Sequence, residues 1–318
     1  CLSNYPPLTL SFASHSILTP QMQDNTSYVL LLYIILFGCQ GWIWTFCLVF
    51  SFIMYKLTVN YRHVLVTSQS PGPVGILDST KISHYVEAVR WMLDTLGVPY
   101  KEECHIPVYG VLLGGRTLPR WRIGRSTLGN TVDIVDFMRG THPEADWLQA
   151  KSPEAEKFLA TIDSLGVHLR RVVYFELLKA DNQTALRDAW SKDAPAWERA
   201  YLALPLNMGM TISCWLMGKL LKINVHGEAR SYHFLEKTIA ETDAMLSDGR
   251  RYLFGDQYSI YDILFCGVGY PLVFPDECRA SSPSWDNIPA ALRKRLTSLR
   301  DSRTGQYILR MYREQRHL

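Results

Sequence analysis

Three hydroxyl side chains stand in front of the first amphipathic helix of the chain, and their position suggests a chemical role. Ser83 immediately precedes a helical pattern of apolar residues, whereas Ser79 and Thr80 come about one turn earlier. A helix N-terminus offers unpaired backbone N–H groups and the positive end of the helix dipole, and a hydroxyl there can hydrogen-bond to an anion such as a thiolate. Serine is also a preferred N-cap without any catalytic duty, so both interpretations of Ser83 are open.

The cysteines offer no alternative chemistry by their spacing. No pair is spaced as CxxC or stands beside a histidine in a zinc-binding pattern. The seven are Cys1, Cys39, Cys47, Cys104, Cys214, Cys266 and Cys278. A thiol-transfer site at the start of this helix would need a cysteine at position 83 or 86. These positions hold Ser83 and Val86 instead, so disulfide exchange is not expected there. We expect a reduced compartment for the soluble part and no bound metal.

The bulk composition is that of an ordinary globular protein. The chain has 318 residues, 47% hydrophobic and 20% charged, which is enough for a substantial core and suggests about two domains. The net charge of +3 is too balanced for a nucleic-acid-binding surface, so that class of function is excluded. The chain begins with Cys rather than Met, and we therefore expect a fragment whose upstream targeting signals are not visible.

An uncharged segment near the start of the chain predicts a membrane anchor. Residues 28–55 carry no charge and are long enough to cross, with some tilt, a hydrocarbon core of about 30 Å. An apolar helix of this length outside the folded domains has no other place to be buried. We expect an N-terminal tail over residues 1–27, a transmembrane helix over residues 28–55 and a linker over residues 56–73.

The charges beside this segment predict its orientation. Lys56 and Arg62 follow it, whereas Asp24 is the only charged residue before it, so the positive-inside rule places the soluble part in the cytosol. Glycosylation sequons at Asn25 and Asn182 argue for the opposite face, but such triplets often arise by chance. The organelle stays open.

The soluble part changes character halfway along its length. An apolar run at residues 74–77 is followed by a polar turn and a helix that Gly97 ends, which is the opening of a βαβ unit. Further strand-like and helical segments lie at residues 100–108, 120–123 and 132–138. From Pro153 onward the spacing is helical, with long helical stretches at residues 185–221, 228–246 and 290–311. The pattern predicts an α/β domain at residues 74–145 and an all-helical domain at residues 152–318.

The segment YLFGDQYSIYDIL, residues 252–264, is the most informative string in the chain. Ser259 and Asp262 form an S-x-x-D capping box, which starts a helix by satisfying free backbone N–H groups. Embedded as FGDxxSxxD, the string resembles the motif found at this place in glutathione transferases, with Tyr261 where that family usually has alanine. Residues 116–119, RTLP, look like the T-V-P motif of the same superfamily, whose proline is cis.

The resemblance implies the glutathione-transferase fold, in which a thioredoxin-like N-terminal domain is followed by an all-helical C-terminal domain, and it implies a binding site for glutathione. It implies that the backbone of Leu118 pairs with the cysteinyl unit on the turn that Pro119 holds, and that Thr131 accepts the γ-glutamyl carboxylate. Asn130 stands where the family usually has an acid, which removes the charge expected to meet the glutathione amine. A plain turn and helix cap is the alternative for Asn130 and Thr131. Ser83 stands where serine-type members place the residue that meets the thiol.

Three functions follow from the resemblance, which covers about residues 74–275. The first is a membrane-tethered glutathione transferase that conjugates the glutathione thiolate to an apolar electrophile. The second is a non-catalytic interaction module like the metaxin group. The third is a glutathione-dependent isomerase resembling prostaglandin E synthase type 2, although the CxxC of that group is missing. The expected partners are glutathione as co-substrate, a hydrophobic small molecule and, through residues 28–55, a membrane; whether a homodimer forms stays open.

Overall fold

The computed structural model describes residues 46–47, 50–51, 54, 74–109, 118–123 and 126–316. The chain divides into two compact units, residues 1–58 and 59–318, and the second holds the sheet and the helices discussed below. Most of the predicted transmembrane helix, the tail before it and the linker after it lie outside the described residues, so these three assignments stay predictions. Among the residues that the structure describes, no single helix is long and apolar enough to cross a bilayer.

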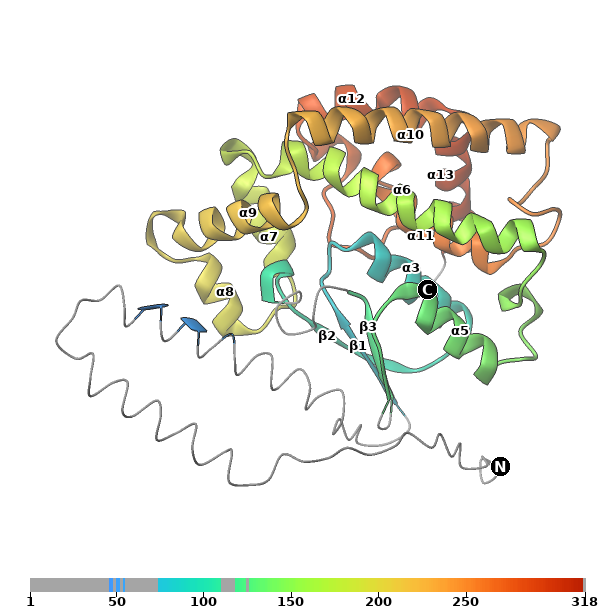
Figure 1. Cartoon of the computed structure of the whole chain (residues 1–318), viewed down its shortest axis with the longest axis horizontal. Coiled ribbons are helices and arrows are strands. Elements are labelled where there is room, and N and C mark those ends of the chain that lie inside the picture. The colour runs from blue at the N-terminus through green and yellow to red at the C-terminus, as the bar shows by residue number, and fades with distance from the viewer. Residues whose placement is uncertain are drawn as a thin grey trace. The chain divides into compact units, whose positions relative to one another are not determined.

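The second unit begins with strands and continues almost entirely with helices (Figure 1). The strands are β1 (Gly75–Ser79), β2 (Tyr100–Cys104), β3 (Arg120–Ile123) and β4 (Ser126–Leu128). The helices among and directly after them are α3 (His84–Thr95), α5 (Thr131–Thr141) and the short η1 (Asp146–Leu148). The following elements are α6 (Pro153–Leu177), η2 (Ala180–Asn182), α7 (Gln183–Ser191), α8 (Ala196–Leu202), η3 (Pro205–Asn207), α9 (Met208–Leu220), α10 (Val225–Met245), η4 (Leu246–Asp248), α11 (Ile260–Val273), η5 (Trp285–Asn287), α12 (Ala290–Asp301) and α13 (Arg303–Gln315).

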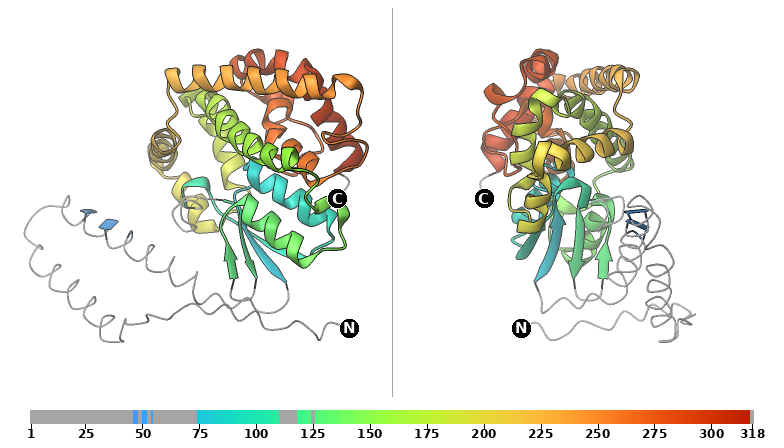
Figure 2. Two further views of the ribbon diagram at one scale, coloured as in Figure 1. Left: turned by 45° about the vertical axis from the view of Figure 1, so that its right-hand side comes forward. Right: turned by 90° about the vertical axis from the view of Figure 1, so that its left-hand side faces the viewer.

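The four strands form one mixed sheet in the order β2-β1-β3-β4. β1 runs parallel to β2, which requires the crossover through α3, and both β1 and β4 run antiparallel to β3. Figure 2 shows the strands at one end of the unit and the helices α10 and α12 at the other, whereas α8 lies beside the sheet. The sheet and the helical remainder fit the predicted glutathione-transferase fold.

Helix α11 is the centre of the core. All of its residues are buried, and it packs against α3, α6 and α13. The contact with α3 is close because Gly267 has no side chain: a Cβ built on it would lie 2.5 Å from the Cα of Ala88. This contact joins the two predicted domains so closely that residues 59–318 form one unit. The predicted boundary between residues 145 and 152 therefore stays a prediction.

Two of the predicted long helical stretches are interrupted. Pro195 and Pro205 divide the stretch over residues 185–221 into α7, α8 and α9, because a proline lacks the N–H that a continuous helix needs. The stretch over residues 290–311 breaks at Ser302, whose hydroxyl accepts a hydrogen bond from the N–H of Gly305 and so caps a new helix. Helical periodicity identified these segments but not their breaks.

Gly267→Ala is expected to destabilise the fold by about 1–3 kcal/mol, since the added methyl group must push α11 away from the backbone of α3. Gly140→Ala is the matched control, because Gly140 lies in α5 with nothing within 4 Å of the position of a Cβ. That change is expected to be neutral or to stabilise the helix by up to about 1 kcal/mol. Thermal melting of both variants checks the contrast, and equal melting temperatures would contradict the close packing at Gly267.

Candidate active site

A cavity of about 620 Å³ lies between the sheet half of the unit and the helices α6 and α9. It is lined by Thr80, Ile82, Ser83, His84, Tyr85, Pro107, Leu118, Asn130, Thr131, Val132, Asp133, Asp163, Val167, Arg170, Tyr174 and Met217. Four of the residues singled out from the sequence, Ser83, Leu118, Asn130 and Thr131, therefore meet at one place. The cavity is large enough for a small-molecule ligand.

Ser83 is the N-cap of α3 and faces this cavity. Its hydroxyl oxygen accepts a long hydrogen bond of 3.4 Å from the N–H of Val86. No hydrogen bond donated by this hydroxyl is found among the described residues, so its proton is available to a ligand. Both interpretations of Ser83 are therefore compatible with the geometry, because the oxygen caps the helix while the O–H group can still donate.

The two rival hydroxyls differ in their availability. Ser79 lies inside β1 and donates a 2.5 Å hydrogen bond to the carboxylate of Glu102, so it is committed to the protein. Thr80 lines the cavity, and its buried hydroxyl has no partner among the described residues. Thr80 is therefore the competitor of Ser83 for a ligand in the cavity.

The turn before β3 has the backbone form that the resemblance implies. The peptide bond between Leu118 and Pro119 is cis. Leu118 lines the cavity and is half-buried, whereas Pro119 is buried and leads directly into β3. The backbone of Leu118 is thus held beside the cavity by the sheet. Arg116 and Thr117 of the same motif lie outside the described residues.

Asn130 acts as a helix cap in addition to lining the cavity. Its side-chain oxygen accepts a hydrogen bond of 2.8 Å from the N–H of Asp133, and its amide nitrogen donates one of 2.6 Å to the Asp133 carboxylate. Thr131 is the first residue of α5. Asp133 also lines the cavity, and it brings the negative charge that Asn130 does not supply. Sequence reasoning missed Asp133, although an acid three residues after an asparagine N-cap is a recognisable pattern.

The ionisable groups deeper in the cavity favour an anionic ligand. Burial, together with the nearby Arg170, lowers the pKa of His84 to about 3, so this imidazole is neutral at physiological pH. Burial raises the pKa of Tyr85, whose hydroxyl donates to the backbone carbonyl of Asp163 over 2.8 Å. Arg170 has no ion-pair or hydrogen-bond partner among the described residues, and its Nε is buried. A half-buried guanidinium that lines a cavity and has no counter-ion among the described residues is a natural partner for a carboxylate or a thiolate.

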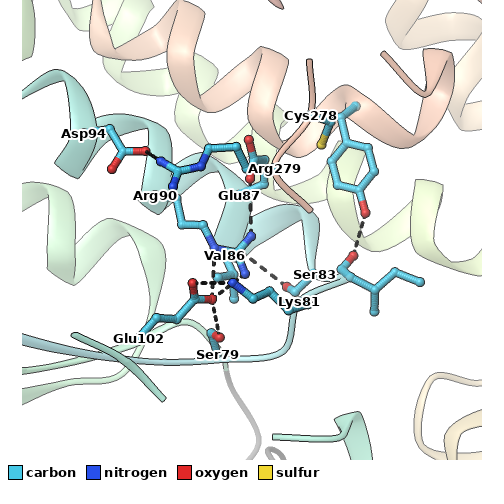
Figure 3. A network of polar contacts seen from close by, with 12 residues as sticks. Ser79, Lys81, Ser83, Val86, Glu87, Arg90, Asp94, Glu102, Cys278 and Arg279 are labelled. Atoms are coloured by element: carbon cyan, nitrogen blue, oxygen red, sulfur yellow. Dashed lines mark hydrogen bonds and ion pairs between the residues drawn. The ribbon is translucent and has the colours of Figure 1, made fainter. Parts of the chain in front are cut away.

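A buried network of charges fixes α3, and with it Ser83, against the sheet (Figure 3). Arg90 on α3 donates to Glu102 on β2 from Nη2 and Nε, over 2.6 and 3.0 Å, and to Glu87 over 3.3 Å. Although burial favours the neutral acid, the Arg90 guanidinium lowers the pKa of Glu102 to about 2. Lys81 adds a second cation to Glu102 at 2.9 Å. These ion pairs therefore join α3 and the turn before it to β2.

The predicted capping box at Ser259 and Asp262 is present and lies outside the cavity. The Asp262 carboxylate accepts hydrogen bonds of 2.8 Å from the N–H of Ser259 and of 2.8 Å from that of Leu253. The Ser259 hydroxyl donates to the same carboxylate over 2.6 Å, as does the hydroxyl of Tyr307 over 2.5 Å. Asp262 is thus the acceptor at the centre of a buried cluster, a larger structural role than helix capping alone.

Comparison with known proteins gives similar solved structures. No protein-family profile matches the chain. No curated protein matches it. A glutathione S-transferase from Methylobacterium radiotolerans, in complex with glutathione sulfonate, is similar over 74% of this chain and 94% of its own, with 16% identity and a TM-score of 0.42.

Two further solved structures are similar at a comparable level. A glutathione S-transferase of Ceriporiopsis subvermispora in complex with glutathione covers 77% of this chain and 98% of its own, with 13% identity and a TM-score of 0.49. The glutathione transferase GSTFuA3 from Phanerochaete chrysosporium covers 77% and 97%, with 14% identity and a TM-score of 0.46.

Proposed function

We propose that the chain binds glutathione in the cavity and transfers its thiolate to an apolar electrophile. The observation that carries this proposal is the meeting of two groups at one cavity: the Ser83 hydroxyl at the N-terminus of α3, and the backbone of Leu118 beside its cis proline. The Ser83 hydroxyl and the helix N-terminus offer a hydrogen-bond donor and a positive dipole end to sulfur, and the Leu118 backbone offers main-chain groups to a peptide-like ligand.

In the proposed reaction the thiol of glutathione loses its proton to solvent, and the Ser83 hydroxyl donates a hydrogen bond to the resulting thiolate. The thiolate then forms a carbon–sulfur bond with the electrophile, whose leaving group departs or whose double bond takes up the electron pair. Ile82, Val167 and Met217 supply the apolar lining that such an electrophile needs.

The charged ends of glutathione have candidate partners in the same cavity. The Asp133 carboxylate is the proposed partner of the γ-glutamyl amine, and Thr131 at the start of α5 is the proposed partner of the γ-glutamyl carboxylate. Arg170 supplies the unpaired positive charge for a further anionic group of the ligand. We further propose, from the sequence, that residues 28–55 tether the enzyme to a membrane with its soluble part in the cytosol.

A non-catalytic binding module is the second candidate. It is favoured by Asn130, because both polar atoms of its side chain are engaged with Asp133 in capping α5 rather than being free for a ligand. In that case the cavity would hold no glutathione, and the fold would serve interaction alone.

Ser83→Ala is expected to lower kcat/KM for conjugation of a model electrophile by about ten- to a hundredfold, because the thiolate loses its hydrogen-bond donor. Ser152→Ala is the matched control: Ser152 also caps a helix, accepting from the N–H of Ala155 over 3.1 Å, but it does not line the cavity. Both variants lose a cap worth about 1 kcal/mol, so a selective loss of activity at Ser83 identifies the catalytic role.

Two further measurements separate the alternatives. Thr80→Val keeps the shape of the rival side chain and removes its hydroxyl, and a larger loss of activity here than in Ser83→Ala would transfer the role to Thr80.

Calorimetric titration of the intact chain with glutathione decides between enzyme and module. Heat of binding that Ser83→Ala leaves nearly unchanged supports the enzyme, whereas the absence of binding to the wild-type chain refutes it.

A further inference from the structure

Apolar side chains that face solvent are concentrated on one part of the second unit. Of the ten large hydrophobic residues that are exposed within residues 74–316, eight lie in the short stretch between Trp197 and Val225. Isolated exposed hydrophobic residues are normal on a soluble protein, but a contiguous group of them marks an interaction surface. We define the α9 face as Leu204, Leu206, Met208, Ile212, Trp215 and Leu220.

Helix α9 is apolar on both of its sides. Met210, Cys214 and Met217 lie on the buried side, which is the packing that a globular domain requires. The opposite side has Met208, Ile212 and Trp215 at helical spacing, where a surface helix ordinarily has polar residues. Because the buried side is already packed, the α9 face needs a second apolar environment.

The turn before α9 also presents an apolar side chain to solvent. Leu206 and Asn207 both have φ of 56°, a left-handed conformation that is uncommon outside glycine. This turn leaves the Leu206 side chain 93% exposed at its tip. Figures 1 and 2 show α8 and α9, in yellow, at the side of the unit.

A cationic groove borders the α9 face. It lies between α6, α9 and the start of α10, has a volume of about 800 Å³, and contains Arg171, Lys179, Lys219, Lys222 and Arg230 among its lining residues. No ion pair of Lys219, Lys222 or Arg230 is found among the described residues, whereas Lys179 pairs with Glu176. Trp215 lies on the border of the two surfaces, 63% exposed and lining the groove.

An apolar face bordered by lysine and arginine, with tryptophan at the junction, is the chemistry of a surface that lies in a membrane interface. The apolar chains would enter the boundary of the acyl region, and the unpaired cations would meet anionic headgroups.

Helix α8 and the stretch Pro205–Leu220 together have the composition of a span but are bent by 81°. In α8, buried Glu198 accepts hydrogen bonds from the N–H of Ile106 over 2.7 Å and from His105 over 2.6 Å when its Nδ1 is protonated. Since these contacts hold α8 on the folded unit, the segment is placed to lie along a bilayer rather than to cross it.

We propose that the α9 face and the cationic groove dock onto a bilayer that contains anionic phospholipid. This docking goes beyond the proposed conjugation reaction and does not depend on it. It is also distinct from the predicted anchor at residues 28–55, which would hold the chain to any bilayer irrespective of lipid charge.

The test uses the full chain, reconstituted into vesicles of phosphatidylcholine alone or with phosphatidylserine. An environment-sensitive fluorescent amino acid replaces Ile212 in one protein and Glu241, an exposed residue of α10, in the control protein. Vesicles that contain spin-labelled lipid report whether the probe reaches the acyl boundary. Because residues 28–55 are the same in both labelled proteins, any difference between the probes at positions 212 and 241 reports only the local contact with lipid.

We expect blue-shifted emission and lipid quenching at position 212 in the anionic vesicles, with little of either at position 241. The double variant Lys219→Glu and Lys222→Glu should lower the quenched population of the probe at 212 by about tenfold or more, because four units of charge change at the headgroups. A water-like spectrum at 212, or equal quenching in neutral and anionic vesicles, would overturn the proposal. A blue shift at 212 without lipid quenching would also overturn it, since a second copy or another segment of the chain would then cover the α9 face.

Discussion

Arg90→Met is expected to destabilise the folded unit by about 3 kcal/mol, because it breaks buried ion pairs and leaves Glu87 and Glu102 each with one cation fewer. Arg90 is 1% exposed and Glu87 is fully buried, so solvent cannot replace the lost guanidinium. Glu87 would retain Arg316, whose Nε donates over 3.0 Å, and Glu102 would retain Lys81. Methionine fills much of the volume, so the loss reports on charge rather than on a cavity.

The same variant is expected to change how stability depends on pH. Glu102 has a pKa of about 2 in the folded chain against its ordinary value of 4.5. A carboxyl group whose pKa is lower in the folded than in the unfolded chain contributes stability that is fully present above about pH 4.5. This contribution is lost as the pH falls towards 2. Without Arg90 this acid-side loss should become smaller, since the pKa of Glu102 moves back towards its ordinary value.

Urea unfolding at pH 7 and at pH 3 measures both effects. Lys237→Met is the control, because Lys237 belongs to an exposed ion pair with Glu241 and its removal should cost less than about 0.5 kcal/mol. A loss in Arg90→Met no greater than in this control would show that the network in Figure 3 does not hold α3.

Asp262→Ala is the second large expected effect, about 3–5 kcal/mol. The change removes one acceptor and leaves four donors: the N–H groups of Leu253 and Ser259 and the hydroxyls of Ser259 and Tyr307. Each buried donor left without an acceptor costs about 1–3 kcal/mol, and relaxation of the hydroxyls offsets part of the sum. The helix that loses its start is α11, which forms the centre of the core.

Two companion variants resolve this cluster. Tyr307→Phe removes a single donor together with its need for an acceptor, and should cost about 0.5–1.5 kcal/mol. Asp262→Asn keeps the size and one acceptor oxygen, so its loss should fall between those of the other two variants. Urea unfolding at pH 7 establishes the order. Equal stability of Asp262→Ala and wild type would mean that α11 starts without this carboxylate.

Local sequence signals predicted the starts and ends of several elements correctly. Ser83, Asn130 and Ser259 were expected at helix starts and are N-caps in the structure. Gly97 was expected to end a helix, and its φ of 65° is the left-handed value that glycine adopts most easily. These outcomes were predictable because caps and C-terminal glycines depend on backbone groups within a few residues. The membrane segment at residues 28–55 is likewise a local prediction, and it lies mostly outside the described residues.

By itself, the sequence determined most of the helical segments and the first strands, where several of them begin, and that Ser83, Leu118, Asn130 and Thr131 are the residues to examine. Only the tertiary structure decided that these four share a cavity with Arg170, which helix α6 brings from far along the chain. It also decided that Glu87 pairs with Arg316 and that α9 keeps an apolar side in solvent. The physical reason is that periodicity predicts which side of an element is apolar, whereas the partner of each side depends on contacts between residues distant in sequence.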